Sequence, residues 1–439
     1  MQIIKNKRLD ILINILIILG ILIWILYPTP PIKNRFYNIK TTITNIGRLL
    51  GIIGLILLSL NIFLSSRVPI IERYFDSLDK AYKKHKKIGI TAYIFLLVHP
   101  LLLLPTYTNL SIHGIINFFK WQWGTPKTYG SIALFLLTIL IILTMYLRKR
   151  SYEFWKKTHQ LMSIPFIIGG IHAWLIPSDT SNNPYLKVYL FLVVSIALIS
   201  YFYNLLLYKT QVKTFTYIVD EVKKLNDLIT EIKLKPIGFN KLEYTSGQFA
   251  FVRFKGQDIK EEEHPFTIST APQKKYITFS IKSLGDFTSK IHNLKKGDKA
   301  ILQGPYGKFS YKNIPYKNQV WIAGGIGITP FKSMAESIER EINKYNIKLI
   351  YSVKKNNEAI YINKFKNLHK KYPNNFKFIL WESSNNNILN AKEILKGVKN
   401  KNNVGFLICG PPKMMEHIKN QLRLSGVPLK NIFLEDFGF

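Results

Sequence analysis

Long apolar segments in the first 207 residues restrict the fold more than any other feature of this sequence. A helix needs about 20 mainly apolar residues to cross a bilayer. Six segments reach or approach that length, at residues 9–27, 46–65, 87–105, 130–147, 159–176 and 185–207. The sequence therefore predicts an all-α bundle of six membrane-spanning helices over residues 1–208.

Basic residues indicate which ends of these helices face the cytoplasm. Lys5, Lys7 and Arg8 precede the first span, and Lys and Arg are dense again between the second and third spans and between the fourth and fifth. The positive-inside rule places these segments and both termini in the cytoplasm, which predicts a multi-pass protein of the cell membrane. The net charge of +35 then fits contact with anionic lipid. No nucleic-acid-binding motif supports a nucleic-acid partner.

Four histidines lie in, or just before, the third and fifth predicted spans. Ligating side chains are costly inside a bilayer and so indicate a functional site, and neutral imidazole is a common axial ligand of haem iron. His85 and His99 are 14 residues apart, which places them near one helix face and about 21 Å apart along the axis. His159 and His172 lie on a helix that runs in the same direction. We expect two stacked haems, an inner one between His85 and His159 and an outer one between His99 and His172.

The 13-residue spacing of the second pair requires a distorted helix, because a straight one would rotate His172 away from the face of His159. Pro165 lies between them and can kink the helix. Gly169 and Gly170 would let a flat ring approach closely. The alternative is that these histidines serve only as interface or hydrogen-bonding residues.

Arg48 lies near the outer end of the second span, where an arginine needs a partner. A haem propionate beside the outer histidine pair would supply one. The alternative is that the side chain extends to the lipid headgroups.

From about residue 209 the sequence reads as soluble domains. Short strands separated by Gly, Pro and Lys predict an antiparallel β-barrel over residues 209–312. Strands then alternate with helical stretches, which predicts an α/β nucleotide-binding domain with a parallel sheet over residues 313–439. The single cysteine, Cys409, excludes an intramolecular disulfide and a Cys-ligated iron–sulfur cluster, and it fits a reducing, cytoplasmic compartment.

Two segments of the predicted barrel suit a flavin nucleotide. The first places an aromatic ring and a hydroxyl on a strand, where they can pack against a flat ring and hydrogen-bond its polar edge. The second combines a cation, a flexible turn and a hydroxyl at a helix start, which suits a pyrophosphate. The candidate FAD contacts are His264, Pro265, Phe266, Thr267, Lys282, Gly285 and Thr288.

Two glycine-containing turns of the α/β domain suit a nicotinamide nucleotide. The turn at residues 323–330 follows a strand and opens a helix, so its backbone can approach a pyrophosphate. The turn at residues 409–412 ends a later strand, at the edge where open α/β sheets bind ligands. The candidate contacts are Gly324, Gly325, Gly327, Thr329, Pro330, Cys409, Gly410 and Pro411.

Three further residues are candidates for cofactor contacts. Lys354 follows the second strand of the α/β domain, where a cation would meet the 2′-phosphate of NADPH, although NADH stays an alternative. Cys409 is expected beside the nicotinamide, or else as a buried structural thiol. The aromatic ring of Phe439 is expected to stack on the flavin and move aside for the nicotinamide, or else to pack in the core.

Together, the segments HPFTIST, GDFT, GPYG, AGGIGITP and CGPP and the terminal Phe resemble the ferredoxin–NADP reductase-type dehydrogenase of the NADPH oxidase and ferric reductase superfamily. The histidine spacings resemble the membrane domain of that superfamily. The resemblance implies FAD, two b-type haems and a nicotinamide donor, with the contacts named above. It also implies that Arg48 matches an arginine beside the outer haem of eukaryotic oxidases. Those oxidases have a histidine one turn beyond the outer ligand, where this sequence has Leu103.

We therefore expect electrons to pass from cytoplasmic NADPH through FAD and two haems to an acceptor outside the cell. The favoured acceptor is O2, which would give superoxide, and Phe439, Cys409 and Arg48 are the expected catalytic residues. One alternative is the reduction of Fe(III) or Cu(II). Another is a membrane-anchored flavin reductase that passes electrons to quinone or to a partner protein. The sequence does not fix the oligomeric state.

Overall fold

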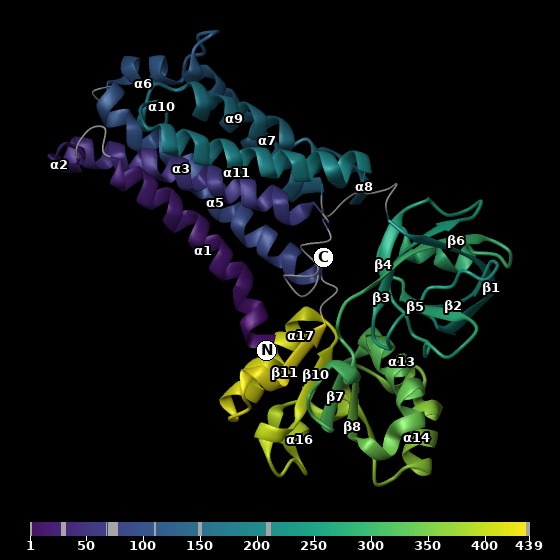
Figure 1. Cartoon of the computed structure of the whole chain (residues 1–439). Helices are drawn as coiled ribbons and strands as arrows, with labels where there is room; N and C mark the ends of the chain where they lie inside the picture. Colours follow the sequence, from purple (N-terminus) through teal and green to yellow (C-terminus); the bar gives the residue numbers. More distant parts are fainter. Residues whose placement is uncertain are drawn as a thin grey trace. The chain divides into compact units, whose positions relative to one another are not determined.

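A computed structural model describes residues 2–27, 32–66, 68, 78–108, 111–147, 152–207 and 212–435 of the chain. The chain divides into two compact units, Met1–Gln211 and Val212–Phe439. The first unit is helical, and the second holds both β-sheets (Figure 1).

Within the described part of the first unit, five helical segments are long and apolar enough to cross a membrane. They belong to α1 (Gln2–Leu26), α3 (Ile39–Ser65), α5 (Leu78–Thr108), α7 (Pro126–Leu147) and α11 (Pro184–Phe202), which continues as a π-helix over Tyr203–Leu207. The shorter helices are α2 (Ile32–Arg35), α6 (Ile112–Phe119), α8 (Tyr152–Gln160), α9 (Ser163–Leu175) and α10 (Asp179–Asn182). A helical membrane unit is thus confirmed, and a count of six spans stays a prediction.

The segment predicted as the fifth span is divided between α8 and α9. The helix is interrupted at Leu161 and Met162, and Pro165 lies in the first turn of α9, where proline is tolerated. The distortion expected between His159 and His172 is therefore present, but it precedes the proline. The 13 residues of α9 extend about 20 Å, which is shorter than the hydrocarbon core of a bilayer.

Helix α3 is the centre of the helical unit, where it packs against α1, α5 and α11. Close approach to α5 depends on small residues, because a Cβ at Gly54 would lie 2.8 Å from the Leu96 side chain. Side chains of α3 such as Ile56 and Leu64 are fully buried. On the other helices many large apolar side chains are exposed, including Ile142 and Phe191. A surface this apolar is expected where a helix faces lipid rather than water.

The second unit begins with a six-stranded antiparallel sheet, so the predicted antiparallel pairing is confirmed, and closure of the sheet into a barrel stays a prediction. Its strand order is β4-β3-β6-β1-β2-β5. The outermost strands are joined by an isolated bridge between Ile268 and Phe279. The strands are β1 (Thr214–Asn226), β2 (Ile229–Pro236), β3 (Phe249–Lys255), β4 (Glu263–Thr267), β5 (Ile277–Lys282) and β6 (Lys299–Tyr306).

A five-stranded parallel sheet follows, in the order β11-β10-β7-β8-β9. Its strands are β7 (Asn318–Gly324), β8 (Asn346–Val353), β9 (Phe376–Glu382), β10 (Gly405–Cys409) and β11 (Ile432–Glu435). Helices α13 (Thr329–Ile338) and α14 (Ile362–Lys371) pack on one face, and α16 (Ala391–Leu395) and α17 (Pro412–Leu424) pack on the other. The predicted parallel sheet is confirmed. The chain order reverses between β7 and β10, and open α/β sheets bind ligands at the carboxyl ends of the strands at such a point.

Candidate functional site

The inner histidine pair is brought together by α5 and α8. The ring centroids of His85 and His159 are 5.9 Å apart, and the ring planes meet at 71°. Metal–imidazole bonds are about 2 Å long, so two imidazoles on opposite sides of one metal ion have centroids roughly 6 Å apart. The indole ring of Trp155 stacks on His159 at 5.4 Å. The centroid spacing of the inner pair therefore fits two imidazoles that would hold one metal ion between them.

A hydrogen bond to the backbone sets the protonation of three of the four imidazoles. The Nδ1 atoms of His85, His99 and His172 lie 2.9, 2.7 and 2.7 Å from the carbonyl oxygens of Asn61, Gly47 and Pro126, respectively. A carbonyl only accepts, so Nδ1 carries the proton and Nε2 keeps its lone pair. This is the arrangement that orients metal-ligating histidines in proteins. In the fourth ring, His159 Nδ1 lies 3.3 Å from the Thr144 hydroxyl.

Glycines on the neighbouring helices make room for the outer histidines. A Cβ at Gly51 of α3 would lie 2.8 Å from His99 Nδ1, and a Cβ at Gly130 of α7 would lie 2.8 Å from His172 Nδ1. His99 is also close enough to His172 for their charges to interact. The sequence interpretation missed both glycines. Each could have been recognised as a glycine inside an apolar span, where no turn requires it and where it lowers helix stability by about 1 kcal/mol relative to alanine.

Arg48 binds a carboxylate of this chain. Its guanidinium lies 3.4 Å from Asp179, which also accepts a hydrogen bond of 2.6 Å from Trp24 Nε1 and pairs with Arg35 at 3.6 Å. Asp179 is buried, whereas the Arg48 side chain is about a quarter exposed. Arg48 also lies within electrostatic range of His99. The sequence interpretation missed Asp179, and contact of Arg48 with a propionate stays a prediction.

The candidate flavin residues gather where β4 meets the 3-10 helix Thr288–Asn293. The His264 ring stacks on Phe287 with centroids 4.2 Å apart, and its Nε2 donates to Glu262 over 3.0 Å. Phe266 lies on the same strand, with its ring 6.5 Å from Phe279. The sequence interpretation missed Phe287 and Glu262, which neither motif pattern singled out.

The remaining candidate flavin residues occupy the second predicted segment and the end of β4. The Thr288 hydroxyl accepts hydrogen bonds from the backbone amides of Leu284 and Gly285, over 2.9 and 3.0 Å, so it caps its own turn. Lys282 ends β5 and is half-buried, and Thr267 is buried. A Cβ at Gly285 would meet no atom within 4 Å, so this turn stands open toward a ligand.

The two candidate nucleotide turns pack backbone against backbone. Ala323 of β7 is in register with Cys409 of β10. A Cβ at Gly327 would lie 2.3 Å from the Cys409 carbonyl, and one at Gly410 would lie 3.0 Å from Gly324 Cα. Gly325 has a φ of +53° and open space beside it. Only glycine fits these close approaches, which leave the backbone of the turn open at the N-terminus of α13.

Three other predicted residues have different surroundings. Cys409 is buried at the end of β10. Lys354 directly follows β8 at the same edge of the sheet and is exposed. Phe439 lies outside the described residues, so its contact with the flavin stays a prediction.

Protein-family models match three successive stretches of the chain. Residues 50–170 match the ferric reductase like transmembrane component, residues 216–310 an FAD-binding domain and residues 321–420 an oxidoreductase NAD-binding domain. The chain has the ferric reductase and NADPH oxidase architecture. It is a transmembrane NAD(P)H-dependent oxidoreductase that transfers electrons through FAD, with a dehydrogenase of the ferredoxin–NADP reductase type.

Individual relatives share parts of this architecture. The toluate 1,2-dioxygenase electron transfer component of Pseudomonas putida is 25% identical over 238 residues, which cover 52% of this chain and 69% of the relative. One component of the Na(+)-translocating NADH-quinone reductase of Methylococcus capsulatus is 32% identical over 167 residues, which cover 35% of this chain and 40% of that relative. A flavohemoglobin structure from Malassezia yamatoensis has a TM-score of 0.50 at 15% identity, covers 91% of this chain and 97% of that one, and shows likeness of fold alone.

The first prediction concerns the space around His172. Gly130→Ala places a methyl group against the imidazole, whereas Ser131→Ala changes the next residue of α7 without adding an atom. Gly130→Ala also raises helix propensity by about 1 kcal/mol, so a weaker helix would not explain a loss of haem. We expect Gly130→Ala to lose most of one haem and Ser131→Ala to keep both, as measured by the absorption of purified protein. Equal haem content in the two variants would show that His172 does not hold a haem at this position.

Proposed function

We propose that this protein carries electrons from cytoplasmic NADPH, through FAD and two haem b groups, to O2 on the outer side of the cell membrane, giving superoxide. The observation that carries the proposal is the state of the four histidines in two pairs. Three of them donate Nδ1–H to a backbone carbonyl and so keep Nε2 available for iron. Six spans, with α8 and α9 together as the fifth, and cytoplasmic termini belong to the same proposal.

The donor set favours haem over a bare metal ion. A metal ion held by protein alone usually has three or four protein ligands. Among the described residues no group of three or more His, Cys, Asp or Glu side chains is arranged to hold a metal. A porphyrin supplies four nitrogens itself, so a pair of imidazoles completes the coordination of its iron. The 5.9 Å spacing of the inner pair fits this arrangement.

Each part of the chain has a separate task in this proposal. When bound, FAD accepts a hydride from NADPH and the haems carry electrons singly, which converts a two-electron donor into one-electron steps. The turn at Gly325 and Gly327 holds the nucleotide pyrophosphate at the start of α13. In this proposal His264 and Phe266 bind the flavin nucleotide, Cys409 contacts the nicotinamide, and Phe439 has the predicted task of stacking on the flavin. The histidine pairs hold and orient the iron, and Arg48 holds an anionic group beside the outer pair.

The apolar surface of α6 and of the segment after it supports O2 as the acceptor. In the predicted topology α6 and the segment after it lie outside, and their apolar side chains are exposed there, including Ile112, Ile116 and Trp123. O2 is small and apolar and needs no polar docking site, whereas a ferric chelate would bind better to a polar or charged surface. Fe(III) or Cu(II) stays the second candidate, because the model that matches residues 50–170 is named for ferric reductases.

A third candidate is a membrane-anchored flavin reductase that passes electrons to quinone or to a partner protein. The similarity to the relatives favours it, since one relative is an electron transfer component and another a component of a quinone reductase. An anchor would not need histidines whose Nε2 atoms are kept free for a metal. Haem content therefore separates this candidate from the other two.

The second prediction tests the ligand assignment. His99→Ala should lower the haem content from about two to about one per FAD and abolish transmembrane electron delivery. NADPH should still reduce the flavin, because the dehydrogenase unit is unchanged. The matched control is His113→Ala, which alters an exposed histidine of α6 and should keep both haems. Retention of both haems in His99→Ala would overturn the assignment.

The third prediction separates the acceptors. Purified protein with NADPH in air should reduce cytochrome c in a reaction that superoxide dismutase inhibits. Without O2, reduction of a ferric chelate should be much slower. The opposite ranking would assign a metalloreductase, and neither activity in haem-loaded protein would assign a quinone or protein acceptor.

The fourth prediction concerns the nucleotide. Loss of a charge-assisted contact with the 2′-phosphate should cost about 1.5 kcal/mol, or roughly tenfold in affinity. We therefore expect Lys354→Gln to raise the KM for NADPH by about that factor and to leave the KM for NADH unchanged. Lys366→Gln, on the exposed side of α14, is the control for general charge loss. An equal change for both nucleotides would show that Lys354 does not recognise the phosphate.

A further inference from the structure

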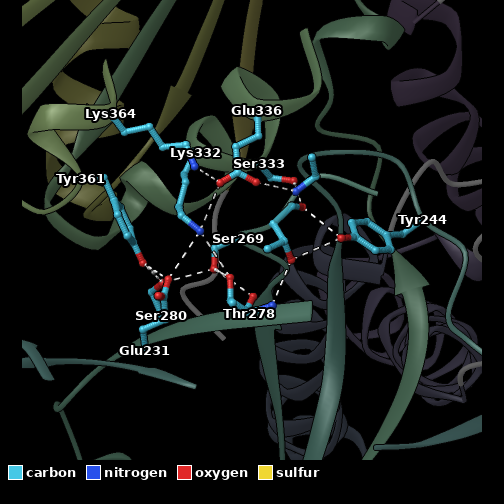
Figure 2. A network of polar contacts seen from close by, with 12 residues as sticks. Glu231, Tyr244, Ser269, Thr278, Ser280, Lys332, Ser333, Glu336, Tyr361 and Lys364 are labelled. Carbon is cyan, nitrogen blue, oxygen red and sulfur yellow. Dashed lines mark hydrogen bonds and ion pairs between the residues drawn. The ribbon is translucent and has the colours of Figure 1, made fainter. Parts of the chain in front are cut away.

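A buried charged cluster joins the FAD-binding sheet to the nucleotide-binding domain (Figure 2). Lys332 of α13 is 6% exposed, although lysine is almost never buried unless it is paired. Its ammonium lies 3.5 Å from Glu231 of β2, 3.6 Å from Glu336 of α13 and 3.4 Å from the Thr278 hydroxyl of β5. Lys332 thus reaches from the helix of one domain to two strands of the other.

The cluster is balanced in charge. Two lysines, Lys332 and Lys364, face the carboxylates of Glu231 and Glu336. Burial alone would raise the pKa of Glu336, but the two ammonium groups outweigh it and hold that pKa below its usual value. Burial, together with the neighbouring Glu231, raises the pKa of Tyr361, so the phenol stays protonated and donates to Glu231.

Tyr361 adds backbone strain to the same cluster. Its φ is +61°, in the left-handed region that a bulky residue rarely adopts. Such a conformation costs about 1–3 kcal/mol and persists where the surroundings hold it in place. Here the phenol bonds to Glu231 and lies 2.6 Å from the Ser280 hydroxyl, and Lys332 lies 4.8 Å from the ring centroid.

Stability alone is a weak explanation for this cluster. Apolar residues of similar volume often replace a buried ion pair without loss of stability, and sometimes with a gain, because desolvation offsets the charge attraction. Ion pairs and hydrogen bonds impose a defined geometry, which apolar packing does not. The geometry in question is that of α13 against the FAD-binding sheet.

Helix α13 connects the two candidate cofactor sites. It begins at Thr329, immediately after the turn that contains Gly325 and Gly327. Within its next turns, Ser333 donates to the carbonyl of Thr270, and Glu336 accepts from the amide of Ala271 over 3.0 Å. Thr270 and Ala271 follow the strand that carries the candidate flavin contacts His264 to Thr267. One short helix therefore begins at the nucleotide turn (residues 323–330) and is bonded to the flavin segment (residues 264–271).

We propose that Lys332 is a positioning residue for hydride transfer. By pairing with Glu231 of β2 and bonding to Thr278 of β5, it fixes α13, and with it the nucleotide turn, against the FAD-binding sheet. In the transfer, the C4–H bond of the nicotinamide breaks and its hydride bonds to flavin N5, so the nicotinamide loses two electrons and the flavin gains them. A misplacement of about 1 Å can slow such a step by roughly 100-fold. The inference rests on FAD and NAD(P)H binding and is independent of the haems.

The test measures flavin reduction directly. FAD-loaded full-length protein is mixed rapidly with NADPH in the absence of O2, and flavin absorbance is followed over a range of NADPH concentrations. Lys332→Met keeps the length of the side chain and removes its charge. We expect its limiting rate to fall by about tenfold or more, with a larger kinetic isotope effect from NADPH deuterated at C4 and little change in nucleotide affinity. Lys332→Arg, which restores the charge, should recover most of the rate.

Lys364→Met is the matched control, because Lys364 pairs with Glu336 from a more exposed position and does not reach the FAD-binding sheet. It should keep the wild-type rate. If Lys332→Met yields no FAD-loaded protein, Glu231→Gln removes the same pair from the other side, and a rate near that of wild type overturns the proposal. A lower melting temperature or FAD content in Lys332→Met, with an unchanged rate in the loaded fraction, would also overturn it and assign a purely structural role.

Because the readout is the flavin, loss of haem leaves this test intact. Wild-type protein that contains FAD but no haem would contradict the proposed transmembrane function, and the inference about Lys332 would be unaffected. Slow flavin reduction in Lys332→Met, with both haems present, would support the inference and leave the proposed function standing.

Discussion

The account depends on one hydrogen-bonding constraint, the donation of imidazole Nδ1–H to a backbone carbonyl of a neighbouring helix. Asn61, Gly47 and Pro126 provide these carbonyls for His85, His99 and His172. Such a bond fixes both the rotation of the ring and its tautomer, and it leaves Nε2 as a ligand. Without such a role, a histidine inside a bilayer would be energetically unfavourable. The carbonyls are accessible because α3 lies close to the histidine-bearing helix α5 and α7 lies close to α9, and glycines at these contacts permit the approach.

The dehydrogenase unit uses backbone proximity in a similar way. Its nucleotide turns meet through glycines at the carboxyl ends of β7 and β10, where open α/β sheets bind ligands. The helix that starts there is bonded to the flavin segment through Ser333 and Glu336, and to β2 of the FAD-binding sheet through the buried Lys332. Both units therefore use groups on neighbouring elements to fix the orientation of residues that would touch a cofactor.

Sequence reasoning located what is encoded locally. Hydropathy identified the helices α1, α3, α5, α7 and α11, because a spanning helix is defined by length and apolarity alone. Glycine turns after strands identified the nucleotide edge, since that chemistry depends on neighbours along the chain. The break at Leu161 and Met162 was expected nearby, but Pro165 turned out to lie in the first turn of α9, where it is tolerated. Residues that act through the tertiary fold were missed: Asp179, Gly130 and Lys332 each contact a residue of another element at least 42 residues away.

The central claim is that each of two pairs of imidazoles holds one haem. It is tested most directly by measuring, on the purified protein, the haem-to-flavin ratio and the spin state of the iron. The account predicts about two haem b groups per FAD, both low-spin and six-coordinate, as two nitrogen ligands for each iron require. Protein that binds FAD and oxidises NADPH but contains no haem after expression with haem supplied would contradict it, as would high-spin, five-coordinate iron at both sites.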